Sequence, residues 1–221
     1  MTKGDITFEF QYLQDRISTA LEQLDGKAKF RQDLWIRDEG GGGRSRIIEN
    51  GDVLEKGGVN FSAVEGILPK KISTALGLSD NSQFYATGVS IVLHPFNPFM
   101  PIIHMNVRYF ETESSDGTTT WWFGGGIDLT PHYVTVPDAE FFHGRLKEVC
   151  DQHDTTYYPR FKKWADDYFF IKHRDETRGI GGIFFDKLND KTGKTKKEIW
   201  DFVLDVGNTF VPIYAQFINN Y

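Results

Sequence analysis

The stretch from Ser90 to Glu111, SIVLHPFNPFMPIIHMNVRYFE, constrains the fold more than any other part of the sequence. Its second half alternates with a period of two, and successive side chains of a β-strand point to opposite faces of a sheet. The pattern therefore predicts a strand with one apolar face and one face of groups that bind anions and move protons. The two sets are Ile103, Met105, Val107 and Tyr109 on one parity, and His104, Asn106 and Arg108 on the other.

The preceding residues continue this pattern. Ser90 and His94 share one parity, and the apolar Val89, Ile91 and Leu93 share the other. If residues 95–101 turn the chain back, the two strands pair antiparallel and their polar rows share a face. A one-residue slip would bury the wrong set, so the pattern fixes the register. A half-solvated sheet face explains the same pattern without a ligand.

The rest of the chain suggests helices that cover a sheet. Apolar spacing and breaker residues predict the following elements. Helices are expected over residues 5–25 and 66–78, after Pro137, from about Pro159 to the GIGG cluster, and from near Lys194; strands are expected over about 83–93, 102–112 and 118–129, with a hairpin turn near Asn50–Gly51. This order predicts one α+β domain.

Composition excludes several classes of function. The net charge of −6 gives no basic field, so we expect no nucleic-acid partner. Apolar runs are too short to span a bilayer, so we expect no integral membrane contact. The single cysteine, Cys150, allows no disulfide within one chain. The first residues, MTKGDITFEF, show no signal-peptide core and no Arg-rich transit pattern, so we expect a cytoplasmic protein.

Other charged residues are candidates for chemistry. Asp128 follows three glycines in WWFGGGIDLTPHY, where a ligand can approach closely, and an aspartate there can orient an N–H group or take a proton. It is equally explained as a turn residue. Arg178 can reach a ligand carboxylate, and so can Arg44 and Arg46 after their run of glycines.

The histidines form no local metal motif. The sequence has no HExxH and no cysteine pairs, although a metal site assembled from distant parts of the chain stays open. His143 lies at the edge of a helical apolar face, which favours a packed residue. His173 is expected to close the helix that starts near Pro159, where the helix dipole favours its protonated form.

Several long segments together resemble one known family. VSIVLHPFNPFMPIIHMNVRYFE, WWFGGGIDLTPHY, FKKWADDYFFIKHRDETRGIGGIFFD, GGGGRSRIIENGDVLEKGGVNFSAV and FHGRLKEVCDQH are similar to segments of the oxygen-dependent coproporphyrinogen III oxidases. The resemblance is collinear from about Phe10 to Phe210. It predicts that residues 1–221 form a single domain that lacks the C-terminal portion of the family.

The resemblance implies a reaction and an architecture. The family uses dioxygen to convert two propionates of coproporphyrinogen III to vinyl groups, giving protoporphyrinogen IX late in haem synthesis. It works as a homodimer and uses no organic cofactor. Its fold is a large antiparallel β-sheet flanked by helices on both faces, a three-layer α/β/α arrangement.

The resemblance also implies roles for residues. The proposed proton donor matches His104, and an aspartate that holds the pyrrole N–H groups matches Asp128. The predicted substrate-binding residues are Ser90, Asn106, Arg108 and Arg178. A divalent metal is assigned in the family to four histidines, which match His94, His104, His143 and His173. We favour chemistry without this metal, because these histidines share no local motif and the reduced pyrrole is itself electron-rich.

Three functions stay open at this stage. The substrate is an apolar disc with an anionic rim, which suits aromatic residues, arginines and one buried carboxylate. The first function is therefore the oxidative decarboxylase. The second is a non-catalytic tetrapyrrole-binding or carrier protein, which would need neither His104 nor Asp128. The third is a metal-dependent oxygenase of another small molecule, which the scattered histidines disfavour.

Overall fold

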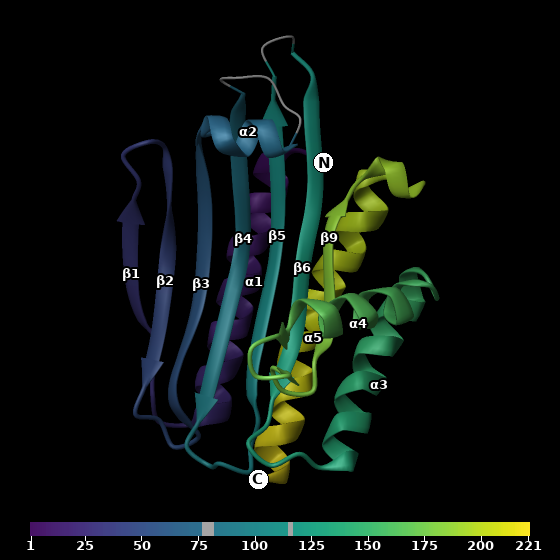
Figure 1. The fold of residues 1–221 in the computed structure, drawn as a ribbon. Helices are drawn as coiled ribbons and strands as arrows, with labels where there is room; N and C mark the ends of the chain where they lie inside the picture. Colours follow the sequence, from purple (N-terminus) through teal and green to yellow (C-terminus); the bar gives the residue numbers. More distant parts are fainter. Residues whose placement is uncertain (77–81, 115–116) are drawn as a thin grey trace.

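The computed structural model describes residues 1–76, 82–114 and 117–221, and Figure 1 shows its helices and strands. The strands are β1 (Arg31–Ile36), β2 (Gly41–Glu49), β3 (Leu54–Ile67), β4 (Gln83–Pro95), β5 (Ile102–Glu113), β6 (Thr119–Thr130), β7 (Phe170–Ile171), β8 (Glu176–Thr177) and β9 (Gly182–Leu188). The helices are α1 (Lys3–Asp25), α2 (Lys70–Leu76), α3 (Val136–His153), α4 (Tyr157–Tyr168) and α5 (Lys196–Asn220), with a short 3₁₀ turn at Asp190–Thr192.

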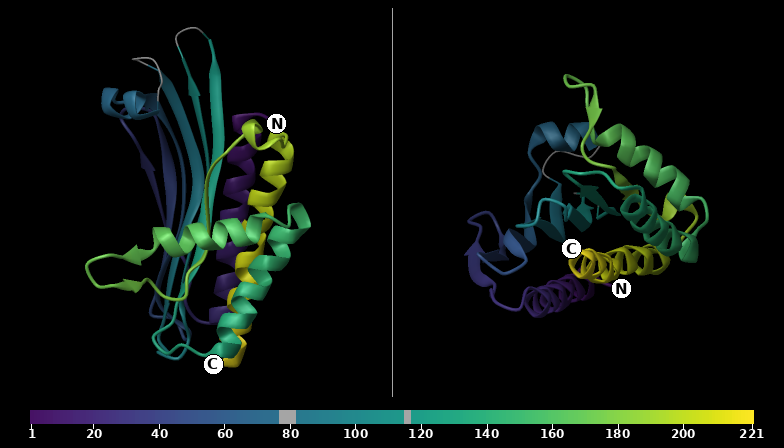
Figure 2. Two further views of the ribbon diagram at one scale, coloured as in Figure 1. Left: turned by 45° about the vertical axis from the view of Figure 1, so that its right-hand side comes forward. Right: turned by 90° about the horizontal axis from the view of Figure 1, so that it is seen from below.

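A large antiparallel sheet organises the fold. Within the described residues it has seven strands in the order β1-β2-β3-β4-β5-β6-β9, while β7 and β8 pair with each other. Figure 2 shows α1 and α5 on one face, with α2 and the β7–β8 hairpin toward the other. The α+β class with a large antiparallel sheet is therefore confirmed, and the helices cover its two faces unequally.

The alternation in the central strands decides which face is the core. Val89, Ile91 and Leu93 of β4 are at most 3% exposed and lie beside the apolar row of β5. Helix α1 adds its own apolar stripe, including Ile6 and Phe10, which are fully buried. The predicted antiparallel pairing of β4 and β5 is confirmed, with Ser90 directly opposite Asn106.

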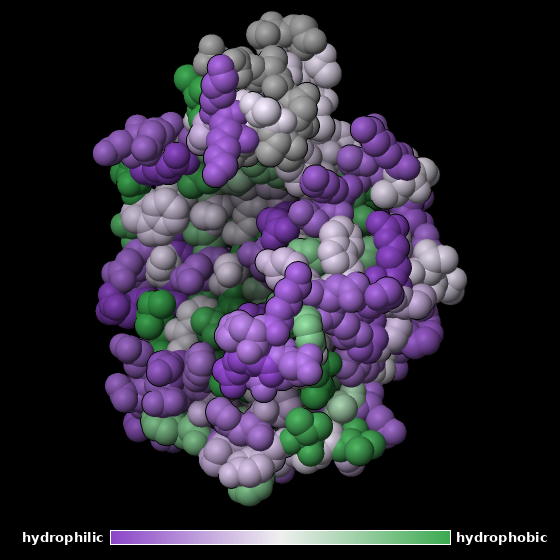
Figure 3. All heavy atoms as spheres, in the orientation of Figure 1, coloured by the Kyte–Doolittle hydropathy of each residue, from purple (hydrophilic) through white to green (hydrophobic). Residues whose placement is uncertain are grey.

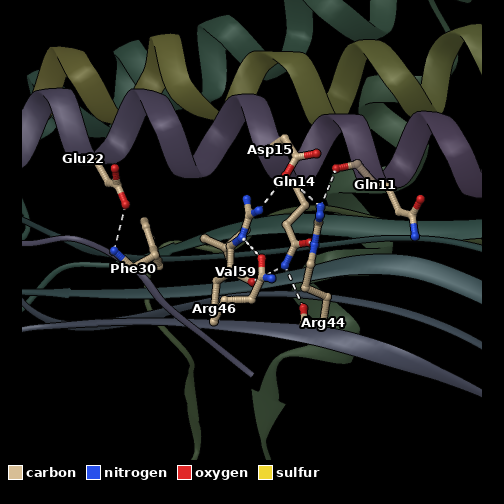
Figure 4. Close-up of polar contacts among 9 residues, drawn as sticks. Gln11, Gln14, Asp15, Glu22, Phe30, Arg44, Arg46 and Val59 are labelled. Carbon is tan, nitrogen blue, oxygen red and sulfur yellow. Dashed lines mark hydrogen bonds and ion pairs between the residues drawn. The ribbon is translucent and has the colours of Figure 1, made fainter. Parts of the chain in front are cut away.

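Arginines of β2 attach this strand to α1, as Figure 4 shows. Nη2 of Arg44 lies 2.8 Å from Oδ1 of Asp15, and Nη2 of Arg46 lies 2.6 Å from the same oxygen. Both side chains are mostly covered. These arginines were expected to reach a carboxylate of a ligand, but the carboxylate that they contact is the protein's own Asp15, and the contacts attach α1 to β2.

Two expected helices have different limits in the structure. The helix expected over residues 66–78 begins only at Lys70, because β3 continues to Ile67, and residues 77–78 lie outside the described residues. The helix expected to run to the GIGG cluster ends at Tyr168. The β7–β8 hairpin follows it, so His173 lies in an exposed turn and the prediction that it closes a helix is wrong.

Strands β1 and β9 were not predicted separately. β9 reads GIFFDKL, and a short apolar run cannot be told from a buried helix segment by periodicity. Across the described residues, no helix is long and apolar enough to cross a membrane.

Candidate functional site

The sheet face opposite α1 and α5 is hollow. A cavity of about 650 Å³ lies beside a second one of about 290 Å³. Both are lined by Asn60, Ser90, Asn106 and Arg108, so they are continuous at these residues. Figure 3 views this face and shows a recess with pale and green residues at its floor and hydrophilic residues around it.

A polar row crosses the floor of the cavities from strand to strand. Asn60 pairs with Ser45 on one side and with Ser90 on the other, and Ser90 pairs with Asn106. Asn106 lies opposite Gly126, which has no side chain to fill the site. The register that the apolar pattern imposes on the core thus aligns hydrogen-bonding side chains on the opposite face.

The smaller cavity ends at a charged cluster. His104 lies opposite Asp128 in the β5–β6 ladder, and its Nδ1 lies 3.2 Å from Oδ2 of Asp128. That ring nitrogen is buried and makes no hydrogen bond. Asp128 is only 3% exposed, and Nη2 of Arg178 donates to both of its oxygens at 2.8 and 2.9 Å. Three residues predicted from the sequence therefore meet in one place.

The turn that carries Arg178 is fastened to the end of β6. The backbone N–H of Ile180 donates to the carbonyl of Leu129, and the N–H of Leu129 donates to Gly181. Gly179 has a φ of +60°, and a Cβ atom there would overlap the carbonyl of Leu129. The guanidinium of Arg178 also lies over the ring of Phe169, 4.4 Å from its centroid. A glycine is therefore required for the turn to place this arginine.

The larger cavity combines one arginine with aromatic rings. Arg108 donates from Nη1 to Oδ1 of Asn106 at 3.1 Å, and its Nη2 lies 3.2 Å from Oδ1 of Asp186. Further along the same face, Phe110 stacks on Trp122 with ring centroids 4.4 Å apart. Flat apolar surface beside a guanidinium suits a flat ligand with an anionic edge.

The four histidines that the resemblance links to a metal do not form a ligand set in the structure. No group of three or more His, Cys, Asp or Glu residues able to hold a metal ion occurs in the described part of the chain. His143 has both ring nitrogens engaged, with Nε2 3.0 Å from the carbonyl of Ile180 and Nδ1 3.1 Å from the hydroxyl of Tyr158. Burial lowers the pKa of His143, which favours the neutral ring. These residues do not fit a shared metal, and we derive no step through one.

The remaining two histidines of that set belong to different elements. His94 is half-buried near the end of β4, and burial, followed by the charge of Lys56, lowers its pKa. His173 lies in the exposed turn of the β7–β8 hairpin. Of the set, only His104 is among the cavity-lining residues described above.

Sequence reasoning missed several residues of the cavities. Asn60 alternates with Val59 and Phe61 in GGVNFSAV, so the period of two was available to find it. Asp186 had no such signal, because its position depends on a local irregularity of β9. The aromatic lining also includes Tyr168 and Phe184, whose rings stack 4.0 Å apart.

Comparison with known proteins places the chain in a family. A family model described as coproporphyrinogen III oxidase matches residues 5–221. The "Coproporphyrinogen-III oxidase 1, chloroplastic" of Arabidopsis thaliana is 46% identical over 215 residues, which are 93% of this chain and 55% of that protein. The "Oxygen-dependent coproporphyrinogen-III oxidase, mitochondrial" of Homo sapiens is 46% identical over 230 residues, 99% of this chain and 50% of that protein.

The "Oxygen-dependent coproporphyrinogen-III oxidase" of Drosophila melanogaster is 48% identical over 200 residues, 87% of this chain and 50% of that protein. The chain spans about half the length of the curated relatives it matches.

The Arabidopsis and human relatives contradict the expected cytoplasmic location, because their names place them in chloroplasts and mitochondria. The expectation rested on the lack of a targeting signal in the first residues. Such a lack carries no weight for a chain that covers half of its relatives. The family match extends over nearly all of the sequence, and the chain therefore belongs to the coproporphyrinogen III oxidase family.

Proposed function

We propose that the protein performs the aerobic oxidative decarboxylation of two propionates of coproporphyrinogen III, giving protoporphyrinogen IX in haem biosynthesis. The observation that carries the proposal is the family match over residues 5–221, which includes both cavities. The chemistry of the cavities supports it. Aromatic rings suit the macrocycle, arginines suit the propionates, and a buried carboxylate suits the inward-facing pyrrole N–H groups.

We assign catalytic roles to His104 and Asp128. Asp128 would accept hydrogen bonds from the pyrrole N–H groups and orient the macrocycle over the sheet. His104, 3.2 Å from Asp128 and without a hydrogen bond at Nδ1, would hold or move a proton. Their shared position at the floor of the smaller cavity supports this pairing.

We assign substrate binding to Ser90, Asn106, Arg108 and Arg178. Ser90 and Asn106 lie side by side at the boundary of the two cavities and offer hydrogen bonds to a polar edge. Arg108 and Arg178 offer guanidinium groups to propionates. Both arginines contact aspartates, so a propionate would share or replace those contacts.

Dioxygen is the proposed co-substrate, as the "oxygen-dependent" names of the relatives suggest. Conversion of one propionate carboxylate to a vinyl group releases carbon dioxide, two electrons and one proton. Dioxygen balances this step by accepting both electrons, that proton and one proton from solvent to give hydrogen peroxide. We propose that no organic cofactor takes part, since dioxygen and the electron-rich pyrrole together account for the electrons.

We further propose a homodimer. The outer edge strand β1 exposes Leu34 by 74% and Ile36 by 90%, which supplies apolar surface for a second copy. The molar mass in solution, measured by light scattering, tests this part independently of turnover.

The test is aerobic turnover of coproporphyrinogen III, with the products separated after oxidation and detected by porphyrin fluorescence. We expect vinyl products, and we expect Asp128→Asn to lower the rate at least about 100-fold. Asp167→Asn is the matched control, because Asp167 lies in an exposed helical ion pair, and its rate should be unchanged. Substrate binding without turnover by the unmodified chain would favour the carrier function, and neither binding nor turnover would contradict the proposal.

A further inference from the structure

Strand β9 carries an extra residue beside the larger cavity, which Asp186 of this strand lines. In the β6–β9 ladder, Phe123 pairs with Leu188 and Gly125 pairs with Phe185, so β9 has one residue more than β6 between these pairs. Lys187, within this irregularity, has a φ of 52°. A β-bulge of this kind redirects a side chain, and a lysine in the left-handed region is held there only by its surroundings.

The bulge directs Asp186 across β6 toward Arg108. Oδ1 of Asp186 lies 3.2 Å from Nη2 of Arg108, an ion-pair contact without hydrogen-bond geometry, although the two residues belong to strands separated by β6. They meet above Gly124, which lies directly opposite Arg108 in the β5–β6 ladder. A Cβ atom at Gly124 would overlap Oδ1 of Asp186 and would lie 2.9 Å from Nε of Arg108. The pair therefore occupies the space that this glycine leaves free.

Arg108 is held at the junction of the cavities by contacts on two sides. Nη1 donates to Asn106 on its own strand, and Nη2 faces Asp186 on β9. A guanidinium has five N–H donors, so these two contacts leave others for a ligand. Arg108 lines both cavities, whereas Asp186 lines only the larger one. The guanidinium thus lies between Asn106 and Asp186 and keeps donors for an anion.

We propose that Asp186, directed by the bulge of β9, is a positioning residue that fixes the guanidinium of Arg108 for a carboxylate of the ligand. The identity of the ligand in this inference rests on the proposed function. The positioning of Arg108 by Asp186 is argued from the structure alone. Asp186 does not touch the reacting atoms in this account and acts through Arg108.

Asp186 has two opposing effects on the binding of an anionic ligand: it repels the ligand by its charge, and it orders the guanidinium that binds the ligand. The proposal states that the second effect is the larger one. The negative charge of Asp186 repels a carboxylate, so its removal would strengthen binding if charge were its only role. Its contact orders the guanidinium, so its removal would weaken binding if positioning were its role. Asparagine removes the charge and keeps a polar oxygen packed against the guanidinium, whereas alanine removes both. The two substitutions therefore separate the two effects.

The first readout is the mobility of the Arg108 side chain, measured in the unliganded protein from NMR relaxation of its Nε–H group. We expect an ordered guanidinium in the unmodified protein and in Asp186→Asn, and a mobile one in Asp186→Ala. Gly124→Ala should also release it, because the added methyl group takes the space of the pair. Its backbone is outside the left-handed region and the overlapping atoms are side-chain ends, so the fold should persist.

The second readout is the affinity for coproporphyrin III, the stable oxidised form of the proposed substrate, measured by quenching of tryptophan fluorescence. Trp35 and Trp122 line the larger cavity and report on occupancy. We expect Asp186→Ala to raise the Kd about tenfold and Asp186→Asn to change it less than about threefold. Arg108→Ala should abolish the effect of Asp186→Ala in the double variant. Asp190→Asn, an exposed carboxylate nearby, should leave the Kd unchanged.

Each alternative outcome is decisive. Tighter binding by both Asp186 variants would overturn the proposal in favour of simple charge repulsion. An equal effect of Asp186→Ala with and without Arg108, or equal mobility of Arg108 in all variants, would overturn it in favour of a structural role. If the unmodified protein neither binds coproporphyrin III nor turns over coproporphyrinogen III, the proposed function fails, and the mobility of Arg108 alone then decides the positioning.

Discussion

Nη2 of Arg178 donates to both oxygens of Asp128, at 2.8 and 2.9 Å, although the two residues are 50 positions apart in the chain. The carboxylate is almost completely buried, whereas the arginine is partly open to the cavity. The turn after β8 thus supplies the cation that makes a buried carboxylate tolerable at the end of β6.

This pair predicts a non-additive effect on stability. Arg178→Met should destabilise the protein by about 2 kcal/mol, because it leaves Asp128 buried beside His104 without its cation. Asp128→Asn in the same chain should recover part of that loss, since no buried charge then remains. Urea unfolding of the two single variants and the double variant measures the coupling. Additive losses would show that the pair does not act as a unit.

We predict that His143 stabilises the turn that carries Arg178. Its Nε2 lies 3.0 Å from the carbonyl of Ile180, two residues after Arg178. His143→Ala should cost about 1 kcal/mol and loosen the turn, and His143→Gln should recover part of it because its amide nitrogen can still donate. Urea unfolding gives the stability, and elemental analysis of the same samples gives the metal content. Stoichiometric metal in the unmodified protein that His143→Ala removes would contradict this role.

We predict that replacement of Gly179 lowers the stability of the protein more than replacement of an ordinary turn glycine does. Gly179→Ala should cost at least about 3 kcal/mol, because the alanine would be strained at a φ of +60° and would also overlap the carbonyl of Leu129. Gly193→Ala is the matched control, since its φ is +82° and an added Cβ would meet nothing within 4 Å. It should cost only about 1 kcal/mol. Thermal and urea unfolding compare the two, and equal losses would refute the clash.

Asp25 predicts a stability change at acid pH. Burial raises the pKa of its carboxyl group, but the backbone N–H donors of Leu54, Ala28, Val53 and Asp52 outweigh burial and leave the pKa below its ordinary value. A lowered pKa means that the folded protein binds this proton more weakly than the unfolded chain does. The stabilisation is therefore complete above about pH 4 and is lost as the pH falls through the lowered value.

The corresponding variant is Asp25→Asn, which should cost about 2 kcal/mol at pH 7 and less as the pH falls. Urea unfolding between pH 7 and pH 2 gives this difference directly. Asp52→Asn is the control, because Asp52 pairs with Lys27 at the surface, and it should change stability little. A difference between the protein and Asp25→Asn that does not shrink with acid would contradict the assignment.

Strands β4 and β5 at the centre of the sheet could be predicted because their side chains alternate between an apolar face and a polar face. The alternation from Val89 to Tyr109 fixed the strands, their pairing and the face shared by Ser90 and Asn106. The same rule placed His104 and Arg108 beside the cavities. Asp128 lies beside these residues because β6 pairs with β5 without a register shift, which places Asp128 opposite His104.

The features that were not predicted depend on contacts between distant segments. The β7–β8 hairpin replaces the expected end of a helix, because the Arg178 segment binds to the carbonyls of Phe169 and Leu129 rather than continuing helical bonds. Asp186 enters the cavity through a bulge that no periodicity marks. Arg44 and Arg46 looked like ligand groups because nothing in the sequence shows that Asp15 lies above them.

The buried side chain of Gln14 has a consequence for the order of folding. Its amide nitrogen donates at 2.7 Å to the carbonyls of both Arg44 and Val59, on strands β2 and β3. The pairing of β2 with β3 sets the spacing of these two acceptors. We therefore expect α1, although first in the chain, to dock after this hairpin has formed. Gln14→Leu should accordingly speed unfolding in stopped-flow urea jumps and leave the refolding rate nearly unchanged.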